Sequence, residues 1–115
     1  MRVPIHSWGV SPHRLASLIP AYAMRKSGET PIEAVVRAIA SATGLAVCGC
    51  SPEGTAILEG KPAADHYQLT LGRYDRASRS YAFAGRVWVA VPVRTVTMVQ
   101  AAPGDFCGLP RRKED

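Results

Sequence analysis

The sequence predicts an α+β fold: a two-layer sandwich in which two N-terminal helices pack on a four- to five-stranded, mainly antiparallel sheet. Two patterns indicate it. Apolar residues recur at helical spacing until Gly44, and beyond that glycine they alternate with a period of two. A chain of 115 residues is long enough to bury a core without metal or disulfide support. We expect one domain over residues 1–110 and a polar tail over residues 111–115.

The first helix is predicted to begin at Ser11 and Pro12, which suit the N-cap and the first helical position. Its apolar face has the spacing i, i+3, i+4 and i+7 and consists of Leu15, Leu18, Ile19 and Tyr22. Pro20 interrupts this face, because proline lacks an amide donor and clashes with the preceding turn. We therefore expect a helix that is kinked at Pro20 and ends before Gly28.

The second helix has the clearest local signals in the chain. Thr30 and Glu33 have the spacing of a capping box, and Pro31 occupies the first helical position. One apolar stripe follows, made of Ile32, Val35, Val36, Ile39 and Ala40. Gly44 is the expected C-terminal glycine. This pattern predicts a helix held against a core by its apolar stripe.

The residues after Gly44 indicate strands separated by turns. Within residues 1–10, the alternation of Val3 and Ile5 with other residues favours a short edge strand. The strands predicted after Gly44 cover residues 45–48, 55–58, 67–71, 80–91 and 95–100.

The longest predicted strand, residues 80–91, separates two kinds of side chain. One face is expected to hold Tyr81, Phe83, Val87, Val89 and Val91. The other is expected to hold Ala82, Ala84, Arg86, Trp88 and Ala90. Small residues around one tryptophan suit the close approach of another surface, including a second copy of the chain. The alternative is that a terminal segment covers this face.

Composition points to a cytoplasmic protein without membrane association. No apolar run approaches the roughly 20 residues of a membrane-spanning helix, and the N-terminus lacks the apolar stretch of a signal peptide. The three cysteines, an odd number, fit reduced thiols better than a disulfide framework. The net charge of +5 is concentrated in residues 61–115, which hold nine basic and five acidic groups.

No recognisable motif indicates a cofactor, a metal or a catalytic centre. Cys48, Cys50, His66 and Cys107 offer zinc-binding atoms, but their spacing differs from that of structural zinc sites. Nucleophile-elbow, zincin and P-loop motifs do not occur. We therefore expect a non-enzymatic protein with neither cofactor nor metal. A small enzyme or metal-binding domain with an unrecognised site is the alternative.

The predicted hairpin before residue 80 is the most informative polar feature. Arginines cluster there with tyrosines between them, and Arg86 and Trp88 follow on the next strand. Arginine with interleaved aromatics suits phosphate contact and base stacking, and it also suits a protein–protein hot spot. The alternative is an ordinary solvated turn. The candidate binding residues are Arg73, Tyr74, Arg76, Arg79, Arg86 and Trp88.

These observations favour a small binding protein of the inhibitor or adaptor type, acting on a protein or nucleoprotein complex. Compact, motif-free domains of this kind are common among phage and plasmid proteins, an argument by association. The first alternative is a nucleic-acid-binding module that uses the Arg/Tyr-rich hairpin.

Overall fold

The computed structural model describes residues 2–93. The predicted strand over residues 95–100, Cys107 and the predicted polar tail lie outside the described residues. The elements in chain order are β1 (Arg2–Pro4), β2 (His6–Ser11), the 3-10 helix η1 (His13–Leu18), β3 (Tyr22–Met24), α1 (Pro31–Thr43), β4 (Ala46–Leu58), β5 (Lys61–Asp75) and β6 (Ser80–Pro92).

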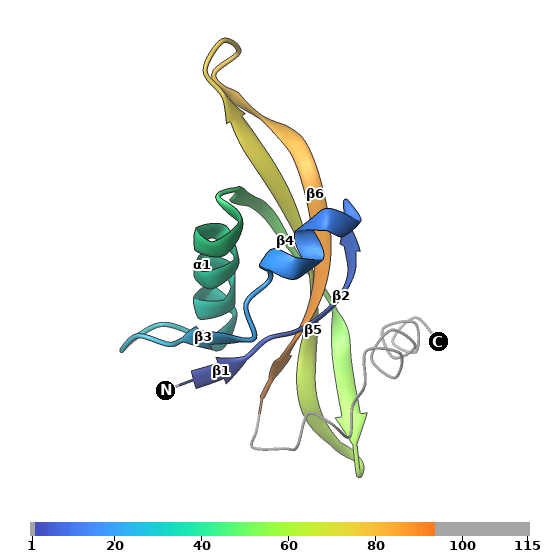
Figure 1. The fold of residues 1–115 in the computed structure, drawn as a ribbon. Helices are drawn as coiled ribbons and strands as arrows, with labels where there is room; N and C mark the ends of the chain where they lie inside the picture. The colour runs from blue at the N-terminus through green and yellow to red at the C-terminus, as the bar shows by residue number, and fades with distance from the viewer. Residues whose placement is uncertain (1, 94–115) are drawn as a thin grey trace.

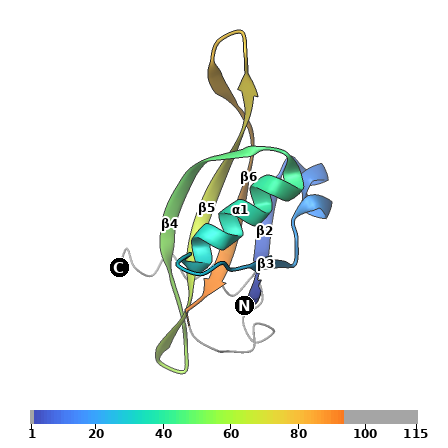
Figure 2. The ribbon, with the colours of Figure 1, turned by 90° about the vertical axis from the view of Figure 1, so that its left-hand side faces the viewer.

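Strands β2, β6, β5 and β4 form, in that order, a four-stranded antiparallel sheet, and β1 pairs with β3 in a separate two-stranded sheet. Helix α1 lies across one face of the larger sheet, as Figure 2 shows. The three long strands β4, β5 and β6 give the molecule an elongated shape with a hairpin at each end (Figure 1). One hairpin joins β4 to β5, and the other joins β5 to β6.

The predicted α+β sandwich with two N-terminal helices packed on the sheet is wrong, because the described residues are mostly β-structure in two sheets and contain one α-helix, α1, besides the short helix η1. The segment after Pro12 forms only the short helix η1, and Ile19 is already extended, with φ −72° and ψ 121°. Pro20 explains the extended conformation of Ile19, because a proline disfavours helical angles in the residue before it. Beyond it, β3 pairs with β1, which places Ala23 opposite Val3 and buries both side chains. Pairing between distant segments therefore overrides the helical spacing.

Ser11 does not cap a helix, because it is the last residue of β2 and pairs with Arg86 of β6. Pro12 is extended, with φ −66° and ψ 150°, and η1 has no side-chain cap. Ser11 and Pro12, which were expected to begin a helix, therefore lie at the end of strand β2. The competing interaction is a backbone pairing with a residue 75 positions later in the chain.

Helix α1 confirms the local prediction. The Thr30 amide donates to Glu33 Oε1 at 2.8 Å, and the Glu33 amide donates to Thr30 Oγ1 at 3.3 Å, which completes the capping box. Gly44 ends the helix in the left-handed region at φ 72°. The buried side chains of the helix, Ala34, Val35 and Ile39, all face the sheet side of the core.

The core lies between α1 and the larger sheet. The sheet contributes buried side chains from its two central strands, namely Leu69, Leu71, Val87, Val89 and Val91. Leu15 of η1 and Val3 of β1 close the same cluster. A second, smaller cluster consists of Ala56, Ala64 and Ala90, with Trp8 and Leu58 packed against them. The long strands are thus anchored along their middle sections.

An ion pair connects the middle of α1, the segment before the helix and the end of β3. Arg37 donates from Nε and Nη2 to the two carboxylate oxygens of Glu29, both at 2.9 Å, and Nη2 also donates to the Met24 carbonyl oxygen. The Lys26 amide donates to Glu29 Oε1 at 2.8 Å. The Arg37 guanidinium and then the Lys26 amide lower the pKa of Glu29 to about 2.

This ion pair predicts an acid-dependent loss of stability. A carboxylate whose pKa falls on folding stabilises the folded state above its unfolded pKa, near 4.5, and that contribution is lost as pH falls towards 2. We expect the difference in unfolding free energy between the natural chain and E29Q to be constant above pH 5 and to shrink below it. Urea titrations at a series of pH values measure it. Parallel pH profiles for the two proteins would contradict the assignment.

Candidate functional site

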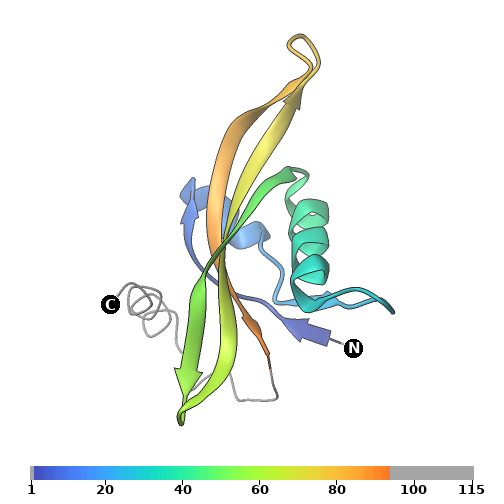
Figure 3. The ribbon, with the colours of Figure 1, turned by 180° about the vertical axis from the view of Figure 1, so that it is seen from behind.

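The β5–β6 hairpin projects beyond the rest of the structure as a two-stranded arm, defined here as residues 72–86 (Figures 1 and 3). Strand β4 makes its first pair with Gly72, at Ala46. Strand β2 makes its last pair with Arg86, at Ser11. Beyond these two residues, β5 and β6 pair only with each other up to Asp75 and Ser80. Both edges of the arm are therefore without a neighbouring strand in the described part of the chain.

The loop at the tip, residues 76–79, is organised by Asp75. Its carboxylate accepts from the Ala77 amide at 3.1 Å and from the Ser78 hydroxyl at 2.9 Å. Arg79 takes the left-handed conformation, at φ 55°, that returns the chain to β6. The acidic residue of the arm is therefore engaged in the turn, and the arginines of the loop, Arg76 and Arg79, are exposed.

A β-bulge at the base of the arm decides which side chains share a face. Leu71 pairs with Gly85 and Gly72 pairs with Phe83, so Ala84 is an extra residue in β6. One inserted residue moves every later side chain to the opposite face, because the side-chain period of a strand is two. The prediction that Tyr81 and Phe83 share a face with Val87, Val89 and Val91 is therefore wrong.

The side chains that share one face of the arm are Tyr74, Tyr81, Phe83 and Arg86, which we call the aromatic face. Tyr74 and Tyr81 are cross-strand partners whose ring centroids lie 5.2 Å apart, edge to face. The Arg86 guanidinium carbon lies 5.7 Å from the Phe83 ring centroid. The exposed fractions of Tyr74, Tyr81 and Phe83 are 51%, 55% and 65%. Three large rings on one face of the ribbon are thus exposed to solvent.

The arm carries four arginines. Arg73 lies on the opposite face of the ribbon, paired with Ala82, whereas Arg76 and Arg79 lie in the loop and Arg86 at the base. All four are exposed. Within residues 2–93 the Arg37–Glu29 contact is the ion pair that the structure shows, and it does not involve the arm. With Asp75 as the single acid, the arm has a formal charge of +3.

Trp88, the remaining predicted site residue, belongs to the body of the sheet. It pairs with Trp8 of β2, is half-buried, and its ring covers the backbone of Gly9. Ala90 is buried with Ala56 in the second cluster, and Ala84 packs against the helix-side core. The predicted face of small residues around Trp88 is therefore divided between different environments. Five of the six predicted residues lie on the arm, and Trp88 lies two residues beyond its end, on the same face of β6 as Arg86.

Tyr81 and Phe83 are the residues of this surface that are absent from the predicted site. Their alternation with Val87, Val89 and Val91 indicated a shared face, because the alternation was continued through Gly85 although that glycine can mark a bulge. Gly85 was the available signal. A Cβ at this position would lie 2.4 Å from the Ser11 carbonyl oxygen, so only glycine fits. Glycine inside a strand is a known mark of a bulge, but it does not say on which side the extra residue lies.

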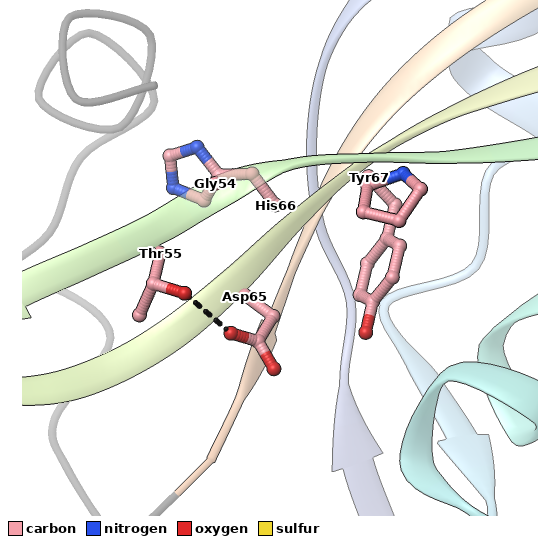
Figure 4. Close-up of a pocket in the computed structure, with 6 residues that line it drawn as sticks. Gly54, Thr55, Asp65, His66 and Tyr67 are labelled. Atoms are coloured by element: carbon pink, nitrogen blue, oxygen red, sulfur yellow. Dashed lines mark hydrogen bonds between the residues drawn. The ribbon is translucent and has the colours of Figure 1, made fainter. Parts of the chain in front are cut away.

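A shallow pocket of about 340 Å³ lies at the other end of the sheet, between β4 and β5 (Figure 4). Thr55 Oγ1 donates to Asp65 Oδ1 at 2.9 Å, and Tyr67 lies beyond Asp65 on the same face. Burial raises the pKa of Tyr67, and the Asp65 carboxylate raises it further. His66 points to the opposite face, where its ring packs edge to face on the Trp8 ring with the two ring centroids 5.3 Å apart. The histidine and the carboxylate therefore do not converge on a common substrate position.

The candidate metal ligands are dispersed. Cys48 and Cys50 are exposed on β4, and His66 is buried on β5. No group of three or more His, Cys, Asp or Glu side chains within residues 2–93 is placed to hold a metal ion. In the same part of the chain, no helix has both the length and the apolar character needed to cross a membrane.

Comparisons of the chain with protein-family models, with curated protein sequences and with solved structures find no match. The functional argument therefore rests on the chemistry and geometry of the arm.

Proposed function

We propose that this chain is a non-enzymatic binding protein of the cytoplasm that engages nucleic acid through its β5–β6 arm. The observation that carries the proposal is the set of four exposed arginines on a projecting ribbon whose only carboxylate is bonded within the turn. Guanidinium groups without acidic partners are available to phosphate oxygens, which they bind with two parallel hydrogen bonds.

The shape of the arm supports the same proposal. A two-stranded ribbon is narrow enough to contact a polynucleotide from more than one side. Arg73 lies on one face, Arg86 on the other, and Arg76 and Arg79 at the tip, so a backbone that follows the ribbon meets a guanidinium along its whole length. The arm offers phenol, phenyl and guanidinium groups, which suit binding rather than covalent chemistry.

Direct binding measurements test the proposed function. We expect the purified chain to bind oligonucleotides at low salt and to lose affinity steeply as salt is added, because phosphate contacts release condensed counterions. Four arginine contacts to a single strand correspond to a slope of roughly −3 in log K against log salt concentration, at about 0.7 per phosphate. Fluorescence anisotropy over a salt series gives the slope. Absence of binding at low salt would overturn the proposal.

A protein partner is the second candidate, and the exposed rings of Tyr81 and Phe83 favour it. Large aromatic side chains with a nearby arginine also form the centres of protein–protein interfaces. Affinity purification separates the two candidates. A stoichiometric protein complex that survives high salt and nuclease treatment would support an inhibitor or adaptor of a protein, whereas loss of the complex on nuclease treatment supports nucleic acid. Size measurement of the purified chain tests a homodimer at the same time.

A further inference from the structure

We infer that the aromatic face of the arm takes the unpaired bases of single-stranded nucleic acid, which stack on Tyr74, Tyr81 and Phe83. This inference rests on the proposed function and specifies its ligand. The rings are exposed and lie on one face of the arm. The positively charged guanidinium of Arg86 lies over the ring of Phe83. Aromatic platforms combined with a basic track are typical of proteins that bind single strands without strong sequence preference.

The spacing of the rings favours bases that are separated from one another. Tyr81 and Phe83 are two residues apart on β6, so their backbone positions lie about 6.8 Å apart along the strand. That is about twice the 3.4 Å between successive nucleotides in a duplex strand. A ring under each of two neighbouring bases therefore requires an extended strand whose bases have left their stack. A duplex does not present base faces in this way, because its bases cover one another.

The tip of the arm argues against insertion between the base pairs of a duplex. Proteins that kink duplex DNA from the minor groove insert large apolar side chains between base steps. The loop residues of the arm are Arg76, Ala77, Ser78 and Arg79, and none of them is a large apolar side chain. The large rings lie instead on the flat side of the ribbon, between the loop arginines and Arg86. The charges thus lie at both ends of the stacking surface, where the phosphates of a strand crossing it would run.

The test compares three ligands of the same length, about 12 nucleotides, a size within the range that single-strand binders cover. They are a single strand, the same sequence as a duplex, and a single strand with abasic sites at its centre, each made as DNA and as RNA. We expect the single strand to bind about tenfold or more tightly than the abasic strand, because the two have the same phosphates and differ in their bases. We expect the duplex to bind more weakly than the single strand. The DNA and RNA series identify which sugar is preferred.

Variants locate the effect on the aromatic face. F83A and Y81A are each expected to weaken single-strand binding about tenfold and to leave the salt slope unchanged, because the removed rings carry no charge. Y22A is the matched control, since Tyr22 is 51% exposed on β3, away from the arm. F83L and Y81V keep an apolar side chain on the strand but remove the ring, so they are expected to weaken binding as the alanine variants do. A thermal melt of each variant shows that the molecule is still folded.

The outcomes distinguish this inference from the proposed function. Equal affinity for intact, abasic and duplex ligands would overturn the stacking inference and leave nucleic-acid binding through the arginines intact. Unchanged single-strand affinity in F83A and Y81A would also overturn it. Failure of the natural chain to bind any of the three ligands would overturn the proposed function itself. Retention of a protein that depends on Phe83 would assign the aromatic face to a protein partner.

Discussion

Replacement of Arg73, Arg76 and Arg79 by glutamine is expected to weaken single-strand binding about a hundredfold at 0.1 M salt. Each arginine that contacts a phosphate contributes about 0.7 to the salt slope, so three of them account for about two powers of ten between 0.1 and 1 M salt. Their side chains are exposed and contact no carboxylate within residues 2–93, so their removal leaves the fold of the arm intact. Anisotropy titrations of the triple variant measure both the affinity and the slope.

The matched control removes the same charge from another part of the molecule. Arg25 and Lys26 lie between β3 and α1, and Lys61 begins β5 at the opposite end of the sheet. All three are exposed. R25Q/K26Q/K61Q therefore has the same net charge as the arm variant. If the two triple variants lose equal affinity, binding depends on net charge and the arm is not the site.

Substitution of Gly9 by alanine is expected to lower the unfolding free energy by about 3 kcal/mol. Gly9 has φ +64°, a conformation that costs a residue with a Cβ about 1 to 2 kcal/mol. The added Cβ would also lie 2.5 Å from Cε3 of Trp88, and overpacking of this kind costs about 1 to 3 kcal/mol. The Trp88 ring is rigid and half-buried, so it does not move aside as a flexible chain would.

Gly28 offers a control that separates the two causes. It also has a positive φ, +82°, but nothing lies within 4 Å of an added Cβ. G28A is therefore expected to cost about 1 to 2 kcal/mol, from backbone conformation alone. Urea denaturation of G9A, G28A and G9A/W88L gives the three values, and W88L is expected to relieve part of the penalty at Gly9. Equal costs for G9A and G28A would show that the ring contact carries no energy.

Prediction succeeded where the interactions are close together in the chain. The capping box at Thr30 and Glu33, the apolar stripe and Gly44 define α1 within one stretch of sequence, and each stabilises the same structure. The arginine-rich turn was also recognisable, because Asp75, Ser78 and the loop arginines are characteristic of a hairpin connection. Arg73, Tyr74, Arg76, Arg79 and Arg86 of the arm were therefore named as candidates from the sequence, whereas Tyr81 and Phe83 were not.

Prediction failed where distant segments compete with local preference. Tyr22 has helical spacing with Leu15 and Leu18, but it lies on β3, which pairs with β1 instead. Ser11 and Pro12 have the signature of a helix start, but Ser11 is held by Arg86. In both cases backbone hydrogen bonds to another strand outweigh preferences that are worth less than about 1 kcal/mol per residue.

By itself, the sequence determined helix α1, the basic turn and the apolar alternation of the sheet, because these depend on residues within a few positions of one another. Only the tertiary structure decided that β5 and β6 extend beyond the strands next to them, because this depends on where the pairing with β2 and β4 ends. It alone decided that Phe83 joins Tyr74 and Tyr81, because one extra residue at Ala84 reverses the alternation of β6. The arginines of the arm can be identified from the sequence, whereas the aromatic face forms only when β5 and β6 pair with the bulge at Ala84.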